Sequence, residues 1–95
     1  MFDTSQIKAI VKRFNAMEGV RGVIITDQEG LPLSSDLDTE TTENVAAHIT
    51  SLVGRAHNVI EALNEGNVRF LRIETDKGEV MVAPDEGGLI LIVLK

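Results

Sequence analysis

Apolar residues of the first stretch of the chain recur every three or four positions: Ile7, Ile10, Val11, Phe14 and Met17. This spacing gives a helix one apolar stripe, so it predicts a helix over residues 3–17. Asp3 is a good N-cap residue, and Gln6 stands where a capping box needs its second member. Gly19 then provides the end of the helix.

A second and longer helix is predicted over residues 39–64, followed by Gly66 as a stop. Its apolar residues share one side: Val45, Ile49, Leu52, Val53, Ala56, Val59, Ile60 and Leu63. The opposite side carries small residues: Ala47, Ser51, Gly54 and Asn58. Glycine in a helix interior costs about 1 kcal/mol relative to alanine. Close approach of another backbone would explain Gly54, and a solvated face that happens to be small explains it equally well.

The other apolar segments are short and are separated by polar turns that contain glycine, which is typical of strands joined as hairpins. We expect five strands: residues 20–26, 31–35, 67–75, 79–84 and 89–94. Pro32 cannot donate a hydrogen bond to a sheet, so the second strand should lie at an edge. The order of elements predicts an α/β fold, with helices packed on a largely antiparallel sheet.

The last strand is apolar on both faces. Its side chains alternate, with Leu89, Leu91 and Val93 on one face and Ile90, Ile92 and Leu94 on the other. Such a strand must be central and covered on both sides. Because two helices are available, we expect the short helix on one face and the long helix on the other.

The two faces should be covered unequally. The long helix measures about 37 Å at ~1.5 Å per residue, whereas a six-residue strand spans about 20 Å. The long helix can therefore shield strands of more than one subunit, and the short helix leaves its own face under-covered. A second copy is the simplest supplier of the missing cover.

The third strand is the predicted seam between two copies. Apolar and charged residues are mixed in it, and one of its sides should be open: Val68, Phe70, Leu71, Arg72 and Ile73. An unpaired edge is a template for pairing with another chain. We expect these residues to form the dimer interface together with Ser51, Gly54 and Asn58 of the long helix.

Length and charge narrow the possible partners. The 95 residues fit a single domain over 1–95, and the net charge of −6 disfavours nucleic acid. The first 22 residues are nevertheless mildly basic, and a basic helix on an acidic body can steer a charged protein partner. The alternative, a solvated face, is the more ordinary one. The residues expected to contact a protein partner are Lys8, Lys12, Ala47 and His57.

The cellular compartment that we expect rests on three features that the sequence lacks: cysteine, a signal peptide and a long apolar run. The chain has no cysteine, which fits a reducing environment. It begins without the basic and apolar regions of a signal peptide, and its longest apolar run, residues 89–94, is too short to cross a bilayer. We expect a cytoplasmic protein with no membrane insertion.

Candidate chemistry is weak throughout the sequence. There is no phosphate-binding loop, and Gly87 and Gly88 fit a turn better than a phosphate cradle. His48 and His57 lie nine residues apart on one helix, which places them on opposite sides, so they cannot share a metal there. The alternating acids over residues 36–40 suit helix capping better than a calcium loop. We expect no enzyme activity, metal or cofactor.

Two stretches of the sequence resemble the roadblock/LC7 family, whose best-known members are dynein light chains. The more specific stretch comprises the segments 70–73, 79–85 and 89–93, which read FLRI, EVMVAPD and LILIV. The second comprises 19–25 and 29–33, which read GVRGVII and EGLPL. The resemblance covers essentially the whole chain, and the ordered combination is more specific than any single piece.

This resemblance implies a five-stranded sheet in the order 2-1-5-4-3 and dimers, with the same or a related chain, through the third strand and the long helix. Many members carry a third helix after the last strand, but this sequence stops at Lys95, so we expect no third helix. The leading functional hypothesis is a dimeric scaffold that binds and regulates a small Ras-like GTPase. A dynein-type light chain that holds an intermediate-chain segment is the alternative, and a small ligand-binding domain is a third possibility.

Overall fold

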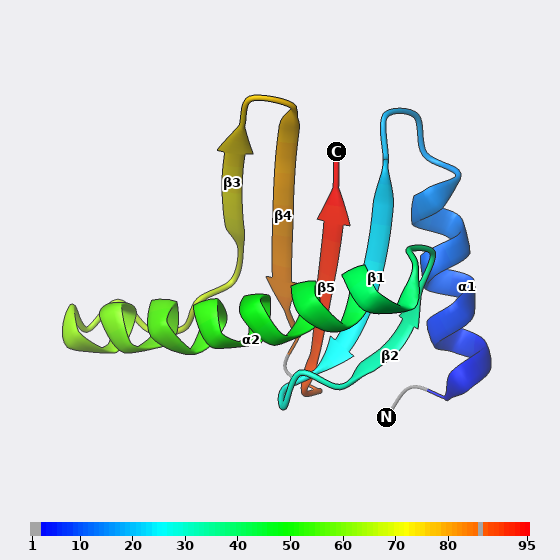
Figure 1. Ribbon diagram of the computed structural model, residues 1–95. Coiled ribbons are helices and arrows are strands. Elements are labelled where there is room, and N and C mark those ends of the chain that lie inside the picture. The colour runs from blue at the N-terminus through cyan, green and yellow to red at the C-terminus, as the bar shows by residue number, and fades with distance from the viewer. Residues whose placement is uncertain (1–2, 86) are drawn as a thin grey trace.

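Two helices and five strands make up the structure, a computed structural model that describes residues 3–85 and 87–95 (Figure 1). In chain order they are α1 (Thr4–Asn15), β1 (Gly22–Asp27), β2 (Pro32–Ser35), α2 (Thr39–Ala62), β3 (Leu71–Thr75), β4 (Gly78–Pro84) and β5 (Leu89–Leu94). The strands form one sheet in the order β2-β1-β5-β4-β3, and every neighbouring pair is antiparallel. This is the predicted fold, including the strand order that the family resemblance implied.

Helix α1 begins with the predicted capping box. The Asp3 side chain accepts a hydrogen bond from the Gln6 N–H at 2.8 Å, and the Gln6 side chain accepts one from the Asp3 N–H at 3.0 Å. The helix ends at Asn15, two residues before the predicted end. Gly19 then takes a φ of 84°, a left-handed conformation that suits glycine and lets the chain turn back into β1.

The core consists of two layers separated by the sheet. The layer beneath α2 contains the buried residues Ile24, Ile49, Val82, Ile90 and Ile92. The layer beneath α1 contains the buried residues Ile7, Val11, Val23 and Ile25, with Leu89 and Leu91 half-buried beside them. Burying one such side chain contributes about 1.5–3 kcal/mol. Central β5 thus contributes to both layers, which confirms that the two helices lie on opposite faces.

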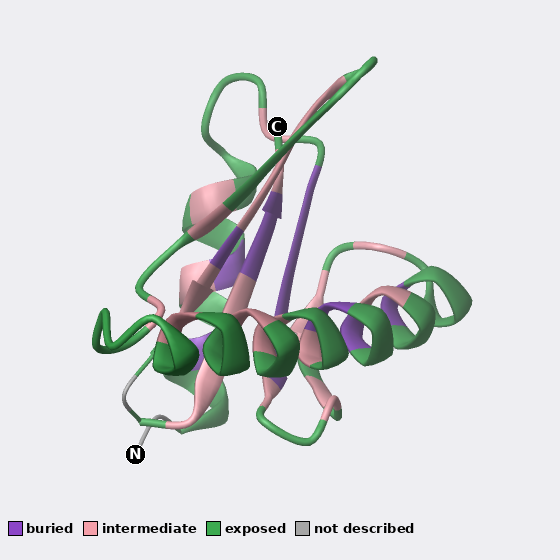
Figure 2. Ribbon diagram, turned by 90° about the vertical axis from the view of Figure 1, so that its left-hand side faces the viewer, coloured by how far each residue is buried: buried purple, intermediate pink, exposed green. Residues whose placement is uncertain are grey.

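Burial along α2 is uneven. Its buried residues Thr42, Ala46 and Ile49 all belong to the first half of the helix. Figure 2 shows the same distribution, with buried segments on the inner strands and on one part of α2. No helix of the described residues is long and apolar enough to cross a membrane.

Some element boundaries differ from those predicted. The third strand begins at Leu71 rather than at residue 67, because α2 runs beyond the sheet and the chain uses residues 63–70 to return. The first strand begins at Gly22 rather than at residue 20, and α2 ends at Ala62 rather than at residue 64. In the turn expected over 85–88, the Gly88 N–H donates to the Asp85 carbonyl at 3.1 Å, and Glu86 lies outside the described residues.

Asp38 is the N-cap residue of α2, and its ionisation makes part of the stability of the fold depend on pH. Hydrogen bonds from the Thr41 side chain and from the Thr41 N–H hold the pKa of Asp38 below its ordinary value of 3.8. A carboxyl group whose pKa is lower in the folded state stabilises that state above its unfolded pKa. The contribution is then lost as the pH falls through the folded pKa.

We therefore expect wild type to exceed Asp38→Asn in free energy of unfolding at pH 7, with the difference shrinking as the pH falls below about 3.8. Urea denaturation at a series of pH values measures this difference. Asp38→Ala, which also loses the cap, should be less stable than Asp38→Asn at every pH. A difference between wild type and Asp38→Asn that stays constant down to about pH 3 would contradict the assignment.

Candidate functional site

Strand β3 forms one edge of the sheet. Within residues 3–85 and 87–95 its one strand neighbour is β4, and the register runs from Leu71 opposite Val82 to Thr75 opposite Gly78. Leu71 is half-buried and the other residues of β3 are exposed. A strand in this position presents unpaired N–H and C=O groups to its surroundings. The outer side of β3 can therefore receive a strand from another chain.

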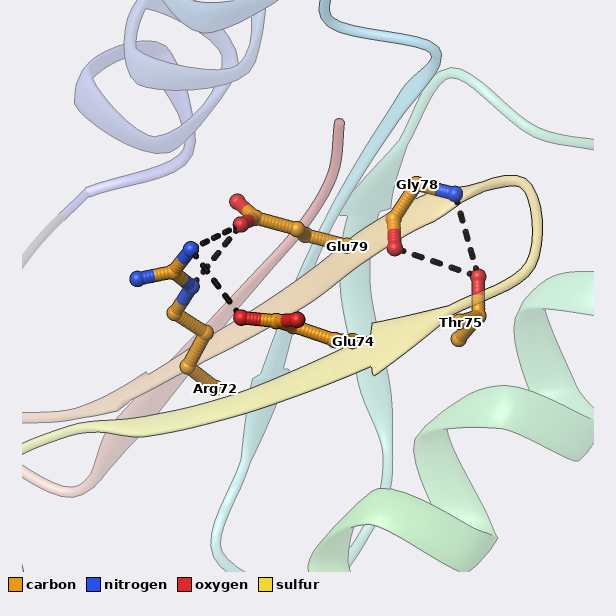
Figure 3. Close-up of polar contacts among 5 residues, drawn as sticks. All are labelled: Arg72, Glu74, Thr75, Gly78 and Glu79. Atoms are coloured by element: carbon orange, nitrogen blue, oxygen red, sulfur yellow. Dashed lines mark hydrogen bonds and ion pairs between the residues drawn. The ribbon is translucent and has the colours of Figure 1, made fainter.

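A two-residue turn fixes the register of the β3–β4 hairpin. The Thr75 hydroxyl accepts hydrogen bonds from the Lys77 N–H at 3.2 Å and the Gly78 N–H at 3.1 Å. Figure 3 shows the contacts between Thr75 and Gly78 at the end of the hairpin. The turn places Glu74 directly opposite Glu79.

A small charged network lies on the same hairpin (Figure 3). The Arg72 Nε donates to the Glu79 Oε1 at 2.8 Å, and a second guanidinium nitrogen donates to the same oxygen. That second nitrogen also lies 3.4 Å from the Glu74 Oε1. Because side chains alternate along a strand, all three lie on the face of the sheet that α1 covers in part. Arg72 was selected from the sequence, but both acidic partners were missed, although the hairpin register could have revealed them.

The second half of α2 extends past β3, as Figure 1 shows. Its apolar side is therefore uncovered there, with Val59 58% and Leu63 64% exposed. On the neighbouring edge, Phe70 is 52% and Ile73 38% exposed. The overhang and the open strand together leave apolar side chains next to free backbone groups.

The outer side of α2 is also open. Ala47, Ser51, Gly54 and Asn58 are all exposed and share one side of the helix. A Cβ atom added at Gly54 would meet nothing within 4 Å. The single chain therefore has no internal contact that requires glycine at this position.

Two surface grooves complete the candidate surfaces. One of about 470 Å³ lies on the α1 face, beyond the helix, and is mainly apolar, with Phe14, Met17, Phe70, Met81 and Leu91 in its lining. The other, of about 1020 Å³, lies on the α2 face and mixes apolar with polar residues, among them Thr50, His57, Asn67, Arg69 and Asp85. No group of three or more His, Cys, Asp or Glu residues in the described part of the chain could hold a metal ion.

The sequence matches the model of the Roadblock/LC7 domain family over residues 6–95. The chain belongs to the roadblock/LC7 family. Its matched segment includes every element of the sheet and all of α2, so the edge and the overhang are parts of the domain itself.

Solved structures share this fold at low sequence identity. The Roadblock/LC7 domain from Streptomyces avermitilis is 22% identical with a TM-score of 0.79, and the match covers 92% of this chain and 72% of that one. MglB from Myxococcus xanthus is 18% identical with a TM-score of 0.87, covering 99% and 74%. The gliding protein MglB from Thermus thermophilus is 11% identical with a TM-score of 0.84, covering 100% and 76%.

The roadblock/LC7 domain places the residues expected to contact a partner on two surfaces. Lys8 and Lys12 are exposed on α1, whereas Ala47 and His57 are exposed on α2, across the sheet. His57 also lies next to Glu61, with 3.5 Å between Nε2 and Oε2. The four residues therefore cannot form one continuous contact within a single chain.

The residues expected at the dimer seam are better grouped. Phe70, Arg72 and Ile73 are exposed and Val68 and Leu71 half-buried, all on β3 or in the segment that leads into it. The remaining three, Ser51, Gly54 and Asn58, lie on the outer side of α2. The candidate site of this roadblock/LC7 domain is thus the β3 edge together with the neighbouring part of α2.

Proposed function

We propose that this chain is a homodimeric, non-catalytic scaffold that binds and regulates a small Ras-like GTPase in the cytoplasm. The observation that carries the dimer is the difference between the two edges of the sheet. One edge is protected against pairing and the other is open.

The protected edge is β2. It has four residues and begins with Pro32, and its register with β1 shifts between Ile25 and Thr26. Both α1 and α2 contact it. Shortness, proline, irregular register and cover by helices are the devices by which proteins prevent edge pairing. Strand β3 contains no proline, and its register with β4 is regular from Leu71 to Thr75.

The overhang of α2 supports the same dimer. Two copies that pair through β3 would form one continuous ten-stranded sheet. The sheet of the second copy would then lie beneath the part of α2 that carries exposed Val59 and Leu63. Pairing through β3 therefore buries apolar surface as well as satisfying backbone groups.

The proposal of a GTPase partner rests on family membership. The roadblock/LC7 resemblance implies scaffolds and activators of Ras-like GTPases, and in activating pairs the GTPase supplies the catalytic groups. MglB, a gliding protein in one of the solved structures, has the same fold. The exposed Lys8 and Lys12 of α1 lie on the side of the helix away from Phe14, which lines the apolar groove. We place a charged contact with the GTPase on this basic side.

The dimer is tested by Phe70→Glu, which puts a charge on the open edge. We expect wild type to sediment as a dimer. The dissociation constant of the Phe70→Glu dimer should be at least about tenfold higher than that of wild type. Leu33→Glu is the matched control, because Leu33 is a 39% exposed apolar residue on the protected edge. A wild-type protein that sediments as a monomer at micromolar concentration would refute the dimer.

The GTPase partner is tested by mixing the purified protein with cognate small GTPases loaded with GDP or a non-hydrolysable GTP analogue. We expect binding that depends on the nucleotide and a changed rate of GTP hydrolysis. Charge reversal by Lys8→Glu with Lys12→Glu should slow association and reduce its dependence on salt, whereas Lys8→Arg with Lys12→Arg should not. No complex and no change in hydrolysis with any GTPase would overturn the proposed partner.

A further inference from the structure

The exposed edge strand carries a charge pattern that is complementary to itself. Arg72 and Glu74 flank Ile73 and point to the same face of the sheet. Their side chains are 54% and 76% exposed. When two copies of a base-x-acid sequence run antiparallel, the base of each copy can face the acid of the other.

The backbone groups of these same two residues face outward. The Lys95 N–H donates to the Glu79 carbonyl at 2.8 Å, so the backbone groups of Glu79 are directed to β5 rather than to β3. Glu74, opposite Glu79, is then in a non-hydrogen-bonded pair of the β3–β4 ladder. Because these pairs alternate, Arg72 is in another. Arg72 and Glu74 therefore present their N–H and C=O groups to the open edge.

The geometry of a symmetric pair restricts the register. A two-fold axis perpendicular to the sheet keeps both copies of α2 on one face. In such a pair, one residue of β3 lies at the axis and stands directly opposite the same residue of the second copy. An axis at Arg72 would put Arg72 opposite Arg72, and an axis at Glu74 would put Glu74 opposite Glu74. Like charges directly opposite each other are destabilising. An axis at Ile73 instead puts each Arg72 opposite Glu74 of the second copy.

We propose that two copies pair through β3 in the register centred on Ile73, and that Arg72 and Glu74 select a second copy of this same chain as the partner. The proposal rests on the proposed dimer and specifies its register and its choice of partner. Each Arg72–Glu74 pair exchanges two backbone hydrogen bonds and one ion pair. Ile73 faces Ile73 on the α2 face, in a non-hydrogen-bonded pair with Cα atoms about 4.5 Å apart.

The charged network of the single chain is compatible with this exchange. Glu79, whose side chain is 27% exposed, holds Arg72 through two guanidinium nitrogens. Glu74 is held less closely, at 3.4 Å, and its side chain is 76% exposed. Glu79 therefore orients Arg72, while Glu74 can turn toward Arg72 of the second copy.

Cysteine cross-linking resolves the register residue by residue, because the chain has no native cysteine. Under mild oxidation we expect Ile73→Cys to form an intermolecular disulfide, since a Cα separation of about 4.5 Å permits one. Arg72→Cys alone and Glu74→Cys alone should not cross-link. In this register each of these residues and its own copy are diagonal neighbours about 7–8 Å apart, which is too far for a disulfide. An equimolar mixture of these two variants should cross-link. Leu33→Cys, on the protected edge, is the control expected to form no intermolecular disulfide under the same oxidation.

Charge reversal tests the choice of partner. Arg72→Glu alone and Glu74→Arg alone each create two like-charge pairs, so we expect self-association about 10- to 100-fold weaker than in wild type. A mixture of the two variants restores both opposite-charge pairs and should form a heterodimer of nearly wild-type affinity. High salt should reduce the difference between the single variants and wild type. Glu29→Arg, in the exposed β1–β2 turn, is the control that should leave the dimer unchanged.

The outcomes separate the register from the dimer itself. A monomeric wild type would overturn the proposed dimer. A dimeric wild type in which Arg72→Cys or Glu74→Cys cross-links alone would overturn only the register, and so would failure of the mixed charge variants to associate better than each variant alone. If a charge variant does not fold, the cysteine variants, which leave the opposing charge in place, still decide the register.

Discussion

The two apolar faces of β5 constrain the rest of the structure. Its Ile90 and Ile92 are buried on one face, and Leu89 and Leu91 pack on the other, so β5 must be central and each face must carry a helix. One hairpin is thereby placed on each side of it, β1–β2 on one and β4–β3 on the other. With five strands and this order, β2 and β3 are necessarily the edges. The position of the candidate site thus follows from the two apolar faces of β5 together with the pairing of β1 and β4 on either side of it.

The two edges then differ because the helices are placed unequally. Both helices reach β2, whereas α2 passes β3 and leaves it beside an uncovered apolar overhang. Backbone groups, apolar side chains and a self-complementary charge pattern therefore meet at one edge of the sheet. Apolar burial supplies most of the affinity in such an interface, and the charges determine which partner and which register are accepted. This division makes the proposed dimer both stable and selective.

Much of the fold could be predicted from the sequence because the periodicity is clear. The alternation of residues 89–94 gave the central strand and the opposite placement of the helices, and Asp3 with Gln6 gave the capping box. The strand order came from the family resemblance, because hairpin turns show which strands pair in sequence but not that β5 lies between β1 and β4. The start of β3 was predicted too early, because the pattern at residues 67–70 is strand-like while the chain there is returning from the overhang of α2.

The site was predictable only in part. Phe70, Arg72 and Ile73 are predictable because an edge strand mixes apolar and charged residues. The network of Arg72 with Glu79 depends in addition on the register of the β3–β4 hairpin, which places Glu79 opposite Glu74. Of the four expected partner residues, Lys8 and Lys12 follow from the basic charge of the first helix, whereas Ala47 and His57 belong to the long helix. Helices on opposite faces of a sheet cannot bring Lys8 and Ala47 together, and the opposite placement of the helices was itself predictable from the alternation in β5.

Amide hydrogen exchange of β3, followed by NMR, tests the central claim most directly. The N–H groups of Arg72 and Glu74 face the open edge, whereas that of Ile73 faces β4. If β3 is the dimer seam, all three amides are protected at high protein concentration, and dilution removes the protection of Arg72 and Glu74 while Ile73 stays protected. Rapid exchange of Arg72 and Glu74 at every concentration, beside a protected Ile73, would show that the edge is bare in solution and would contradict the claim.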